Sequence, residues 1–433
     1  MPFDTILRNA TLPDGRKGQD VAIAAGRIAA IEPRIEAEAG QRIDARGYLL
    51  SPPFVDCHFH MDATLSLGLP TLNHSGTLLE GIALWGELKP QLTHEAVAER
   101  ALRYCDLAVS QGLLAVRSHV DVCDDRLLAV EALLDVKKRV KPYLDLQLVA
   151  FPQDGYFRSP SAAQNLERAL DLGVEVVGGI PHFERTMAEG AASVKALCEI
   201  AARRGLMVDL HCDESDDPLS RHVETLACEA QRLGLGDRAT GSHLTSMHSM
   251  DNYYVSKLLP LIAESGICAI SNPLINLTLQ GRHDTYPRRR GVTRIAEMRA
   301  LGIPVALGQD CVMDPWYGLG GADMLDVAHM AVHGAPMTSR EAIRWTFDAV
   351  TEIPAAILGL EGYGLAVGKN ADMVLLQAAD PIEAVRLRAT RLLVIRRGET
   401  IARTAPRETE LTLTGRPPTL DPASYAPRVS QEK

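Results

Sequence analysis

Two histidines separated by one residue stand in the segment Pro52–Thr64, which reads PPFVDCHFHMDAT. A short apolar run leads into His58 and His60, as at the end of a buried β-strand. Side chains alternate between the two faces of a strand, so these imidazole rings should point the same way. Two imidazoles on one face can bind one metal ion. A chance pair of histidines in a loop would look the same, so the prediction depends on further ligands downstream.

Further ligand-type residues follow three later apolar runs. His211 ends MVDLHCDE, His243 lies in ATGSHLTSMH, Asp310 ends PVALGQDC, and Glu214 stands three residues after His211. Zn²⁺ and Fe²⁺ bind three or four such ligands and keep a position open for water. The pKa of that water falls from about 15.7 toward about 7, which supplies hydroxide near neutral pH. The sequence therefore predicts a hydrolytic metal centre.

Each of these residues also has a purely structural interpretation. A single buried histidine can be a hydrogen-bonded core residue, and a single aspartate can cap a helix. Five ligand-type side chains at the ends of apolar runs are harder to explain in that way. The histidines for which the structural role is the simpler interpretation are His119, His182 and His248.

The ligand-type residues stand at the ends of apolar runs that alternate with helical stretches such as residues 93–112 and 124–138. Near-continuous apolar runs, each followed by a polar tip and then a helix, are typical of buried parallel strands. With the strand before His58 there are eight such units, the number in a (β/α)₈ barrel, whose active sites lie where the strands end. The seven later runs cover residues 113–122, 145–155, 174–184, 207–215, 239–249, 268–279 and 304–312.

Both ends of the chain alternate apolar and polar residues over short segments, which indicates β-strands. We expect residues 1–51 and 358–415 to form one small β-sandwich beside a metal-dependent barrel that spans residues 52–357. The last segment, residues 416–433, is polar and rich in proline, and predicts a tail on the surface. The fold class predicted is therefore α/β.

The composition of the 433 residues is that of a globular enzyme, with 46% hydrophobic and 23% charged residues. The formal charge of −10 argues against a nucleic-acid partner, because phosphate binding needs a basic surface. No apolar run approaches the length of a membrane span, and the N-terminus does not resemble a signal peptide. The eight cysteines include no Cys-x-x-Cys pair, as expected of reduced thiols in a cytoplasmic protein.

The order of the ligand-type residues, HxH and then His, His and Asp on later strands, resembles the amidohydrolase superfamily. The string GLAVGKNADMVLL resembles that superfamily's return to its β-domain. Several longer strings resemble the bacterial cytosine deaminase family, and the resemblance covers essentially the whole chain. These strings are VAFPQDG, IPHFE, HCDESDD, SHLTSMHS, NPLINLTLQGRHDTYPRRRG and DPWYGLGGADML.

The resemblance implies that His58, His60, His211 and Asp310 hold one divalent metal ion, Fe²⁺ or Zn²⁺. Strand four carries IPHFE around His182 and offers no lysine for carboxylation, so a bridged two-metal site is not expected. The family often forms homo-oligomers, and the resemblance implies the same for this chain.

The resemblance also implies roles around a small nucleobase substrate. Glu214 would move the proton between water, ring nitrogen and leaving amine, and Asp310 would take the proton of the attacking water. His243 would hold the attacking hydroxide, Gln153 would hydrogen-bond the ring's carbonyl and N–H edge, and Trp316 would wall the pocket. Deamination needs protonation of N3 and of the departing ammonia, and one carboxyl group that accepts and returns a proton serves both steps.

The sequence departs from the family pattern beside Asp310. Cys311 stands where the family has a second carboxylate, and Gln309 stands where it has histidine. The carboxylate borders the C5–C6 side of the ring, and cysteine is smaller, neutral and mildly apolar. We hypothesise that Cys311 opens the pocket to 5-methylcytosine, since burying a methyl group gains about 0.8 kcal/mol whereas desolvating a carboxylate is unfavourable. The alternative is a neutral exchange that leaves cytosine preferred.

Two other functions remain open from the sequence. Enzymes on the same barrel hydrolyse N-alkylamino-triazines or cyclic amides, and only the strings around Gln153 and Trp316 argue against that chemistry. A barrel that has lost its metal would have no activity, although all four ligands and Glu214 are present. Nucleic-acid deaminases combine HxE with PCxxC. The chain has HxE at 182–184 but no PCxxC, which favours a free base as the substrate.

Overall fold

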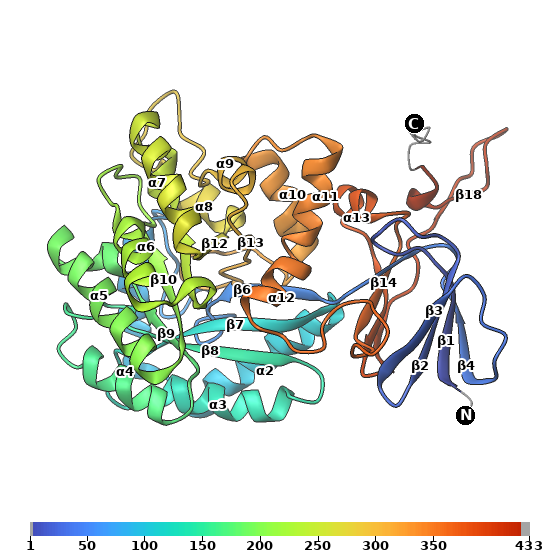
Figure 1. Ribbon diagram of the computed structural model, residues 1–433, viewed down its shortest axis with the longest axis horizontal. Helices are drawn as coiled ribbons and strands as arrows, with labels where there is room; N and C mark the ends of the chain where they lie inside the picture. The colour runs from blue at the N-terminus through green and yellow to red at the C-terminus, as the bar shows by residue number, and fades with distance from the viewer. Residues whose placement is uncertain (1–2, 426–433) are drawn as a thin grey trace.

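The structure, a computed structural model, describes residues 3–425. Figure 1 shows two parts side by side: a barrel wrapped by helices, and a smaller β-region built from the blue start and the red end of the chain. Apolar strands and amphipathic helices can bury their faces only against one another, and each part does so around its own core.

Eight strands form the barrel sheet, and each pairs in parallel with its neighbours in chain order. A parallel bridge between Phe59 and Asp310 brings the first strand beside the chain that leaves the eighth. This arrangement confirms the predicted (β/α)₈ barrel. The strands are β6 (Phe54–Phe59), β7 (Leu113–Asp121), β8 (Asp145–Phe151), β9 (Val176–Gly179), β10 (Met207–Cys212), β11 (Ala239–His243), β12 (Cys268–Ser271) and β13 (Val305–Leu307).

Helices connect the strands and cover the outside of the barrel (Figure 1). The helices after β6, β7, β8 and β9 are α1 (Leu78–Leu88) and α2 (His94–Ser110), α3 (Leu128–Val140), α4 (Ala162–Asp171) and α5 (Met187–Arg204). Those after β10, β11 and β12 are α6 (His222–Leu233), α7 (Asn252–Ser265), α8 (Pro273–Leu279) and α9 (Ile295–Ala300). Those after β13 are α10 (Met324–Gly334), α11 (Arg340–Asp348) and α12 (Glu352–Ile357).

Local signals set where two of the predicted helices begin. α2 starts after Thr93, whose hydroxyl accepts the backbone N–H of Ala96 as an N-cap. α3 begins at Leu128, four residues later than predicted, because the chain first makes a turn in which the N–H of Leu127 donates to Asp124 O. Leu127 itself is left-handed, with φ of 50°, and cannot belong to the helix.

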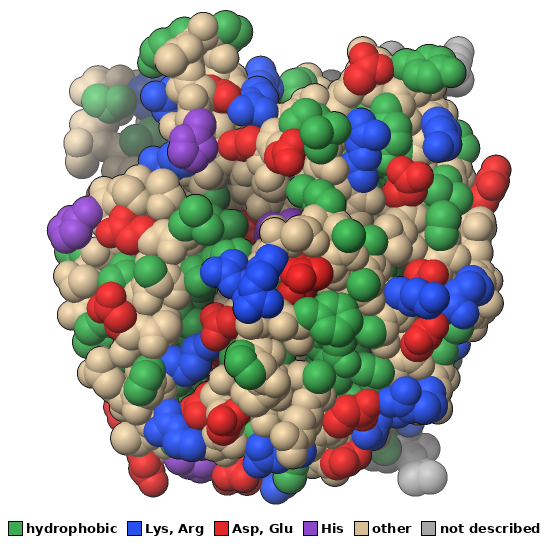
Figure 2. Space-filling model, turned by 90° about the vertical axis from the view of Figure 1, so that its left-hand side faces the viewer, with side chains coloured by type: hydrophobic (Ala, Val, Ile, Leu, Met, Phe, Trp, Pro, Cys, Tyr) green, Lys and Arg blue, Asp and Glu red, His purple; other side chains and the backbone are tan. Residues whose placement is uncertain are grey.

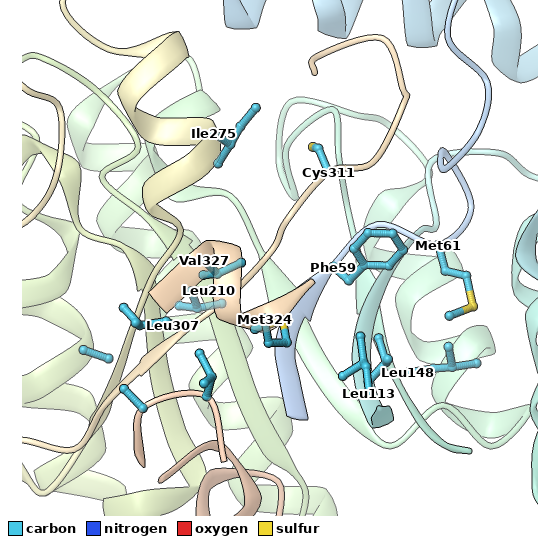
Figure 3. Close-up of a cluster of buried hydrophobic side chains, with 14 of the residues drawn as sticks. Phe59, Met61, Leu113, Leu148, Leu210, Ile275, Leu307, Cys311, Met324 and Val327 are labelled. Carbon is cyan, nitrogen blue, oxygen red and sulfur yellow. The ribbon is translucent and has the colours of Figure 1, made fainter. Parts of the chain in front are cut away.

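The barrel strands are apolar on both faces because one face packs into the barrel interior and the other against the helices. Every residue of β7 is buried, although this strand includes charged side chains. Figure 3 shows part of the core, with Phe59, Leu113 and Leu148 among its buried side chains. The cluster reaches upward to Cys311 beyond β13 and Ile275 on α8.

Two four-stranded sheets form the smaller part, in the orders β3-β2-β1-β4 and β16-β15-β14-β5. β5 comes from the start of the chain but pairs with β14 from its end, and apolar residues of both sheets share one core. This confirms the predicted β-sandwich formed by both chain ends. The strands are β1 (Phe3–Ala10), β2 (Gln19–Ala24), β3 (Arg27–Glu32), β4 (Ala39–Asp44), β5 (Leu49–Ser51), β14 (Met373–Leu376), β15 (Arg391–Arg396) and β16 (Glu399–Arg403).

The last described residues lie along the sandwich. β17 (Thr409–Glu410) pairs with β18 (Thr419–Leu420), and the hydroxyl of Tyr48 donates to Asp421 Oδ2 at 2.6 Å. Residues 426–433 of the predicted tail lie outside the described residues, and the boundaries proposed between the domains stay a prediction. Among residues 3–425, no helix is both long enough and apolar enough to cross a membrane.

Candidate metal centre and active site

Four strand ends bring the expected metal ligands and His243 together at the carboxyl end of the barrel. The Nε2 atoms of His60, on the chain leaving β6, and His211, on β10, lie 3.0 Å apart. Asp310 Oδ1, beyond β13, lies 3.4 Å from His60 Nε2 and 3.7 Å from His58 Nε2. His243, at the end of β11, places Nε2 3.7 Å from Asp310 Oδ2. The structure therefore brings together residues that are up to 252 positions apart.

The backbone at these strand ends adopts conformations that aim side chains into the barrel mouth. His243 and Asp310 have φ of 71° and 69°, in the left-handed region that non-glycine residues seldom adopt. The N–H of Asp310 donates to His58 O at 2.8 Å, and the N–H of His60 donates to Asp310 O at 3.1 Å. These bonds join the first strand to the chain after the eighth and hold the ligands in register. Strained residues of this kind concentrate at functional sites.

The imidazoles of the cluster are neutral. Burial lowers the pKa of His60 to about 4, and it lowers the pKa values of His58, His211 and His243 well below their usual range. Burial, together with the neighbouring Glu214, raises the pKa of Asp310 well above its usual range. Neutral imidazoles offer lone pairs, and a buried carboxylate gains most from a nearby cation.

Buried polar atoms without a hydrogen-bond partner also indicate that this site can hold a cation. Within the part of the chain that the structure describes, neither ring nitrogen of His58 has a hydrogen-bond partner, nor does Nδ1 of His211. Buried polar atoms are rarely left unpaired, so these atoms call for a ligand. The His and Asp groups could hold a divalent metal ion, and their nitrogen and oxygen donors suit Zn²⁺ or Fe²⁺.

Glu214 lies beside this cluster and contacts His243. Its Oε1 is 3.4 Å from His243 Nδ1, and burial raises the pKa of Glu214 to about 8. Asn276 Nδ2 lies 3.1 Å from the same His243 nitrogen and 3.5 Å from Glu214 Oε1. Asn272 Nδ2 lies 3.3 Å from His243 Nδ1. The structure thus adds two amides that the sequence interpretation missed as site residues.

The two asparagines come from a segment that the sequence predicted to continue the seventh strand. The strand stops at Ser271, and Pro273 begins helix α8, since proline favours the first turn of a helix. Asn272 and Asn276 are four residues apart at this helix start and therefore lie on one face. The signal available in the sequence was Asn-Pro followed by a second asparagine one turn later.

A cavity opens beside the cluster, and the empty space within it, including the part open to solvent, is ≈ 350 Å³. The predicted substrate-binding residues Gln153, Cys311 and Trp316 all line this cavity, whereas His58 and His243 do not. The barrel face that lies away from the β-sandwich is hollowed, with histidine visible in the hollow, and acidic and basic side chains are interspersed around it (Figure 2). The residues that line the cavity are His60, Leu78, Gln153, Ile180, His211, Glu214, Ile275, Leu279, Asp310, Cys311 and Trp316.

Cys311 lies between the cavity and two carboxyl groups. Its thiol approaches Asp310 Oδ1 at 3.6 Å, and burial raises its pKa well above the usual range, so the sulfur is a neutral thiol. The second carboxyl group belongs to Asp314, which is fully buried. Asp314 Oδ1 accepts the backbone N–H groups of Trp316 and Tyr317, both at 2.9 Å, and so fixes the loop that carries the indole.

The loop that carries Gln153 is also fixed by a carboxylate. Glu184 is buried after β9, and its two oxygens accept the N–H groups of Tyr156, Phe157 and Arg158 at 2.6 to 3.3 Å. Three N–H groups on one carboxylate form charge-assisted hydrogen bonds that hold the turn rigidly. Glu184 is the acidic residue of the HxE string at residues 182–184, which the sequence interpretation considered only for zinc chemistry.

The three histidines that were expected to have a structural role, His119, His182 and His248, differ from one another in their hydrogen bonding. His182 Nδ1 lies 2.9 Å from His211 O, and His248 Nε2 lies 3.0 Å from Asp216 Oδ1, so both are tied to neighbouring groups. The ring of His119 lies 4.3 Å from that of His58, centroid to centroid. Among the described residues, neither of its ring nitrogens has a hydrogen-bond partner.

Comparison with known proteins gives the family of this chain. The profile of the amidohydrolase family matches residues 41–403. N-isopropylammelide isopropyl amidohydrolase of Pseudomonas sp. (strain ADP) is 30% identical over 93% of this chain and 98% of its own length. Pterin deaminase of Rhizobium rhizogenes is 28% identical over 94% of this chain and 95% of its own length.

A solved structure shares both the fold and much of the sequence. 5-Methylcytosine deaminase from Klebsiella pneumoniae, liganded with 5-fluorocytosine, superposes with a TM-score of 0.90. The two sequences are 42% identical over 92% of this chain and 98% of that chain. This chain belongs to the amidohydrolase family. It is an enzyme of the hydrolase class that acts on C–N bonds.

Proposed function

We propose that this chain deaminates a free nucleobase by hydrolysis, converting 5-methylcytosine to thymine or cytosine to uracil with release of ammonia. One observation carries the proposal: a single cavity is lined by Gln153, Glu214, Asp310 and Cys311 beside two histidines of the metal cluster. The likeness to 5-methylcytosine deaminase supports the same reaction.

The proposed binding of the base uses the amide and the indole. Gln153 can donate one hydrogen bond and accept another, which matches a ring edge that offers a carbonyl oxygen and an N–H. The turn held by Glu184 follows Gln153 directly and fixes the backbone there, so this backbone need not be ordered when the base arrives. Trp316 would pack against the flat ring as a wall of the cavity.

The proposed chemistry needs a nucleophile and one shuttled proton. A bound divalent cation would lower the pKa of the attacking water. Glu214 would start protonated and give its proton to N3, and Asp310 would take one proton from the water as it attacks C4. Glu214 would next carry the proton of the C4 hydroxyl group to the leaving amine, and the proton held by Asp310 would return to Glu214. His243 and Asn276 lie within 3.5 Å of Glu214 Oε1 and would keep this carboxyl group in place. The water oxygen ends as the C4 carbonyl, and the amine leaves as ammonia.

The proposed preference for 5-methylcytosine rests on Cys311. The neutral thiol lines the cavity with Ile275, which Figure 3 shows on helix α8, so this part of the lining is apolar. A methyl group on C5 would gain by leaving water for such a surface, whereas a carboxylate at position 311 would lose hydration beside it.

The finer properties of the enzyme are also proposals. We propose one metal ion per chain, Fe²⁺ or Zn²⁺, held by His58, His60, His211 and Asp310. The donor atoms of His58, His60 and Asp310 lie within 4.8 Å of one another, and His211 Nε2 lies 3.0 Å from His60 Nε2. We further propose a cytoplasmic homo-oligomer, with no nucleic-acid or membrane partner. The unpaired state of all eight cysteines is in keeping with the cytoplasm.

A second candidate reaction comes from one relative. N-isopropylammelide isopropyl amidohydrolase is 30% identical to this chain, and its name describes removal of an alkylamine from a triazine ring. Both reactions add water to a ring carbon and expel an amine, so the same proton transfers would serve.

Product analysis distinguishes the two reactions. Protein loaded with Fe²⁺ or Zn²⁺ is incubated with 5-methylcytosine, cytosine, isoguanine and N-isopropylammelide, and ammonia, isopropylamine and the ring products are measured. We expect ammonia with thymine or uracil, and a kcat lower by about 10² to 10⁴ for the Glu214→Gln variant. Isopropylamine from the triazine, with no ammonia from any of the three bases, would replace the deaminase proposal with the second reaction.

A further inference from the structure

We propose that Gly81, the fourth residue of helix α1, is a specificity-determining position of the active site. It lies outside the cavity lining and acts through Trp316, whose indole can lie back against the helix only because Gly81 has no side chain. The inference rests on the proposed deamination and adds a residue that sets the width of the cavity.

One face of α1 points toward the cavity and the indole. Leu78, Gly81 and Trp85 are spaced three and four residues apart, so they share a face of the helix. Leu78 lines the cavity, Gly81 and Trp85 are buried, and the rings of Trp85 and Trp316 lie 6.1 Å apart. Trp85 Nε1 donates to Asp121 Oδ2 at 2.8 Å, which fixes this face of the helix to the end of β7.

The contact between Gly81 and the indole leaves no room for a methyl group. A Cβ atom at position 81 would lie 2.3 Å from Trp316 Cδ1 and 2.6 Å from Trp316 Nε1. Carbon atoms in contact normally lie about 3.5 to 4.0 Å apart. Glycine is less favourable than alanine inside a helix, so its presence here needs a reason, and this close approach supplies one.

The indole of Trp316 can move away from a side chain at position 81 in only one direction, which is toward the cavity. Asp314 holds the backbone N–H of Trp316, so the loop cannot retreat as a whole. The indole also lines the cavity, and its ring lies 6.2 Å from that of His60, centroid to centroid. A side chain at Gly81 would therefore push the indole away from α1 and into the cavity that it lines. The base with the extra methyl group should lose more from this narrowing than cytosine.

Helix α1 offers a matched control. Gly86 lies five residues further along the same helix and is exposed, and a Cβ atom there would meet no atom within 4 Å. Alanine at position 86 changes the helix in the same way as alanine at position 81, but it touches nothing.

The test compares Gly81→Ala and Gly86→Ala, each in the natural chain and in a Trp316→Phe background. kcat/KM for 5-methylcytosine and cytosine is measured with metal content and Tm. We expect Gly81→Ala to lower kcat/KM for 5-methylcytosine by about tenfold or more, and for cytosine by less. Gly86→Ala should stay within about twofold of the natural chain. In the Trp316→Phe background, where the ring is smaller, Gly81→Ala should lower kcat/KM by only about a further twofold.

Two results would overturn the proposal. One is a Gly81→Ala variant with unchanged kcat/KM for both bases. The other is an equal loss with and without Trp316, since the glycine would then act by another route. If the natural chain releases ammonia from neither base, the deamination proposal fails, and Tm decides alone. A lower Tm for Gly81→Ala that recovers in the Trp316→Phe background supports the contact, whereas an unchanged Tm refutes it.

Discussion

His60 Nε2 lies 3.0 Å from His211 Nε2, although the two residues are 151 positions apart and come from different strands of the barrel. Two neutral imidazoles can share one proton in a hydrogen bond, or both can direct a lone pair at one cation. The nearby carboxylate of Asp310, 3.4 Å from His60 Nε2, favours the second arrangement. The two rings are therefore placed to bind the same ion at the proposed metal site.

Removal of the metal should abolish activity. We expect the purified protein to hold about one Fe²⁺ or Zn²⁺ per chain and to lose deamination on prolonged chelation, with recovery when either ion returns. His60→Ala should lose both metal and activity, measured by elemental analysis and ammonia release. The surface variant His94→Ala, whose imidazole pairs with Asp135 away from the site, should retain both. Full activity in a chelated sample that contains no metal would contradict the assignment.

Glu214→Gln should retain metal but lose deamination. The amide preserves the size of the side chain and cannot accept and return the proton, so we expect kcat to fall by about 10² to 10⁴. Rapid-quench measurement of ammonia release checks the rate, with metal content as the control for folding. Glu199→Gln, on a half-exposed glutamate paired with Arg232, should match the natural chain. A Glu214→Gln enzyme with near-normal kcat would remove this residue from the proton path.

Glu184→Gln should weaken base binding without touching the chemistry. An amide can accept fewer of the N–H groups of residues 156–158, so the turn behind Gln153 loosens. We expect KM to rise by about tenfold while kcat and metal content change little. The control is Glu189→Gln, since Glu189 also accepts a backbone N–H, that of Arg185, but on an exposed helix start. Equal KM values for the two variants would show that the turn does not depend on Glu184.

Arg117→Met should destabilise the barrel. Arg117 and Asp209 form an ion pair at 3.0 Å inside the strands, with exposures of 1% and 0%. Loss of the arginine leaves a buried carboxylate unpaired, which costs about 3 to 5 kcal/mol in the free energy of unfolding. Urea unfolding measures this loss. The double change with Asp209→Leu should recover most of it, because no buried charge is then left alone.

The control for this ion pair lies on the surface. Lys138 pairs with Asp135 at 3.3 Å, and both side chains are more than half exposed. Lys138→Met should change the free energy of unfolding by less than about 1 kcal/mol, since exposed pairs contribute little. A double variant of the buried pair that is no more stable than Arg117→Met would show that packing, rather than charge, causes the loss.

The barrel and its ligand cluster could be predicted because they rest on local patterns. His58 on β6 and His60 just beyond it lie in one group with Asp310, and parallel strands bring His211 to the same end of the sheet. The joint β-sandwich was predictable for a similar reason, since the alternating segments at both ends need a common core.

The supports of the site depend on contacts between segments that are distant in the sequence, and a local pattern does not show which segments meet. In the sequence, Asn276 is a single polar residue in an apolar run. In the structure, helix α8 directs its side chain toward His243. Glu184 lies 31 residues from Gln153 and acts through a turn between them. The role of Gly81 depends on its contact with the indole of Trp316, and the loop after β13 places this indole against α1.

The most direct test of the proposed activity is a competition between two bases in one tube. Metal-loaded enzyme receives equal concentrations of 5-methylcytosine and cytosine, and thymine and uracil are followed together. We expect thymine to accumulate first, by about tenfold or more in relative kcat/KM, and Cys311→Asp to reverse the order. Uracil ahead of thymine in the natural chain would contradict the role of Cys311, and release of neither product would contradict the proposed deamination itself.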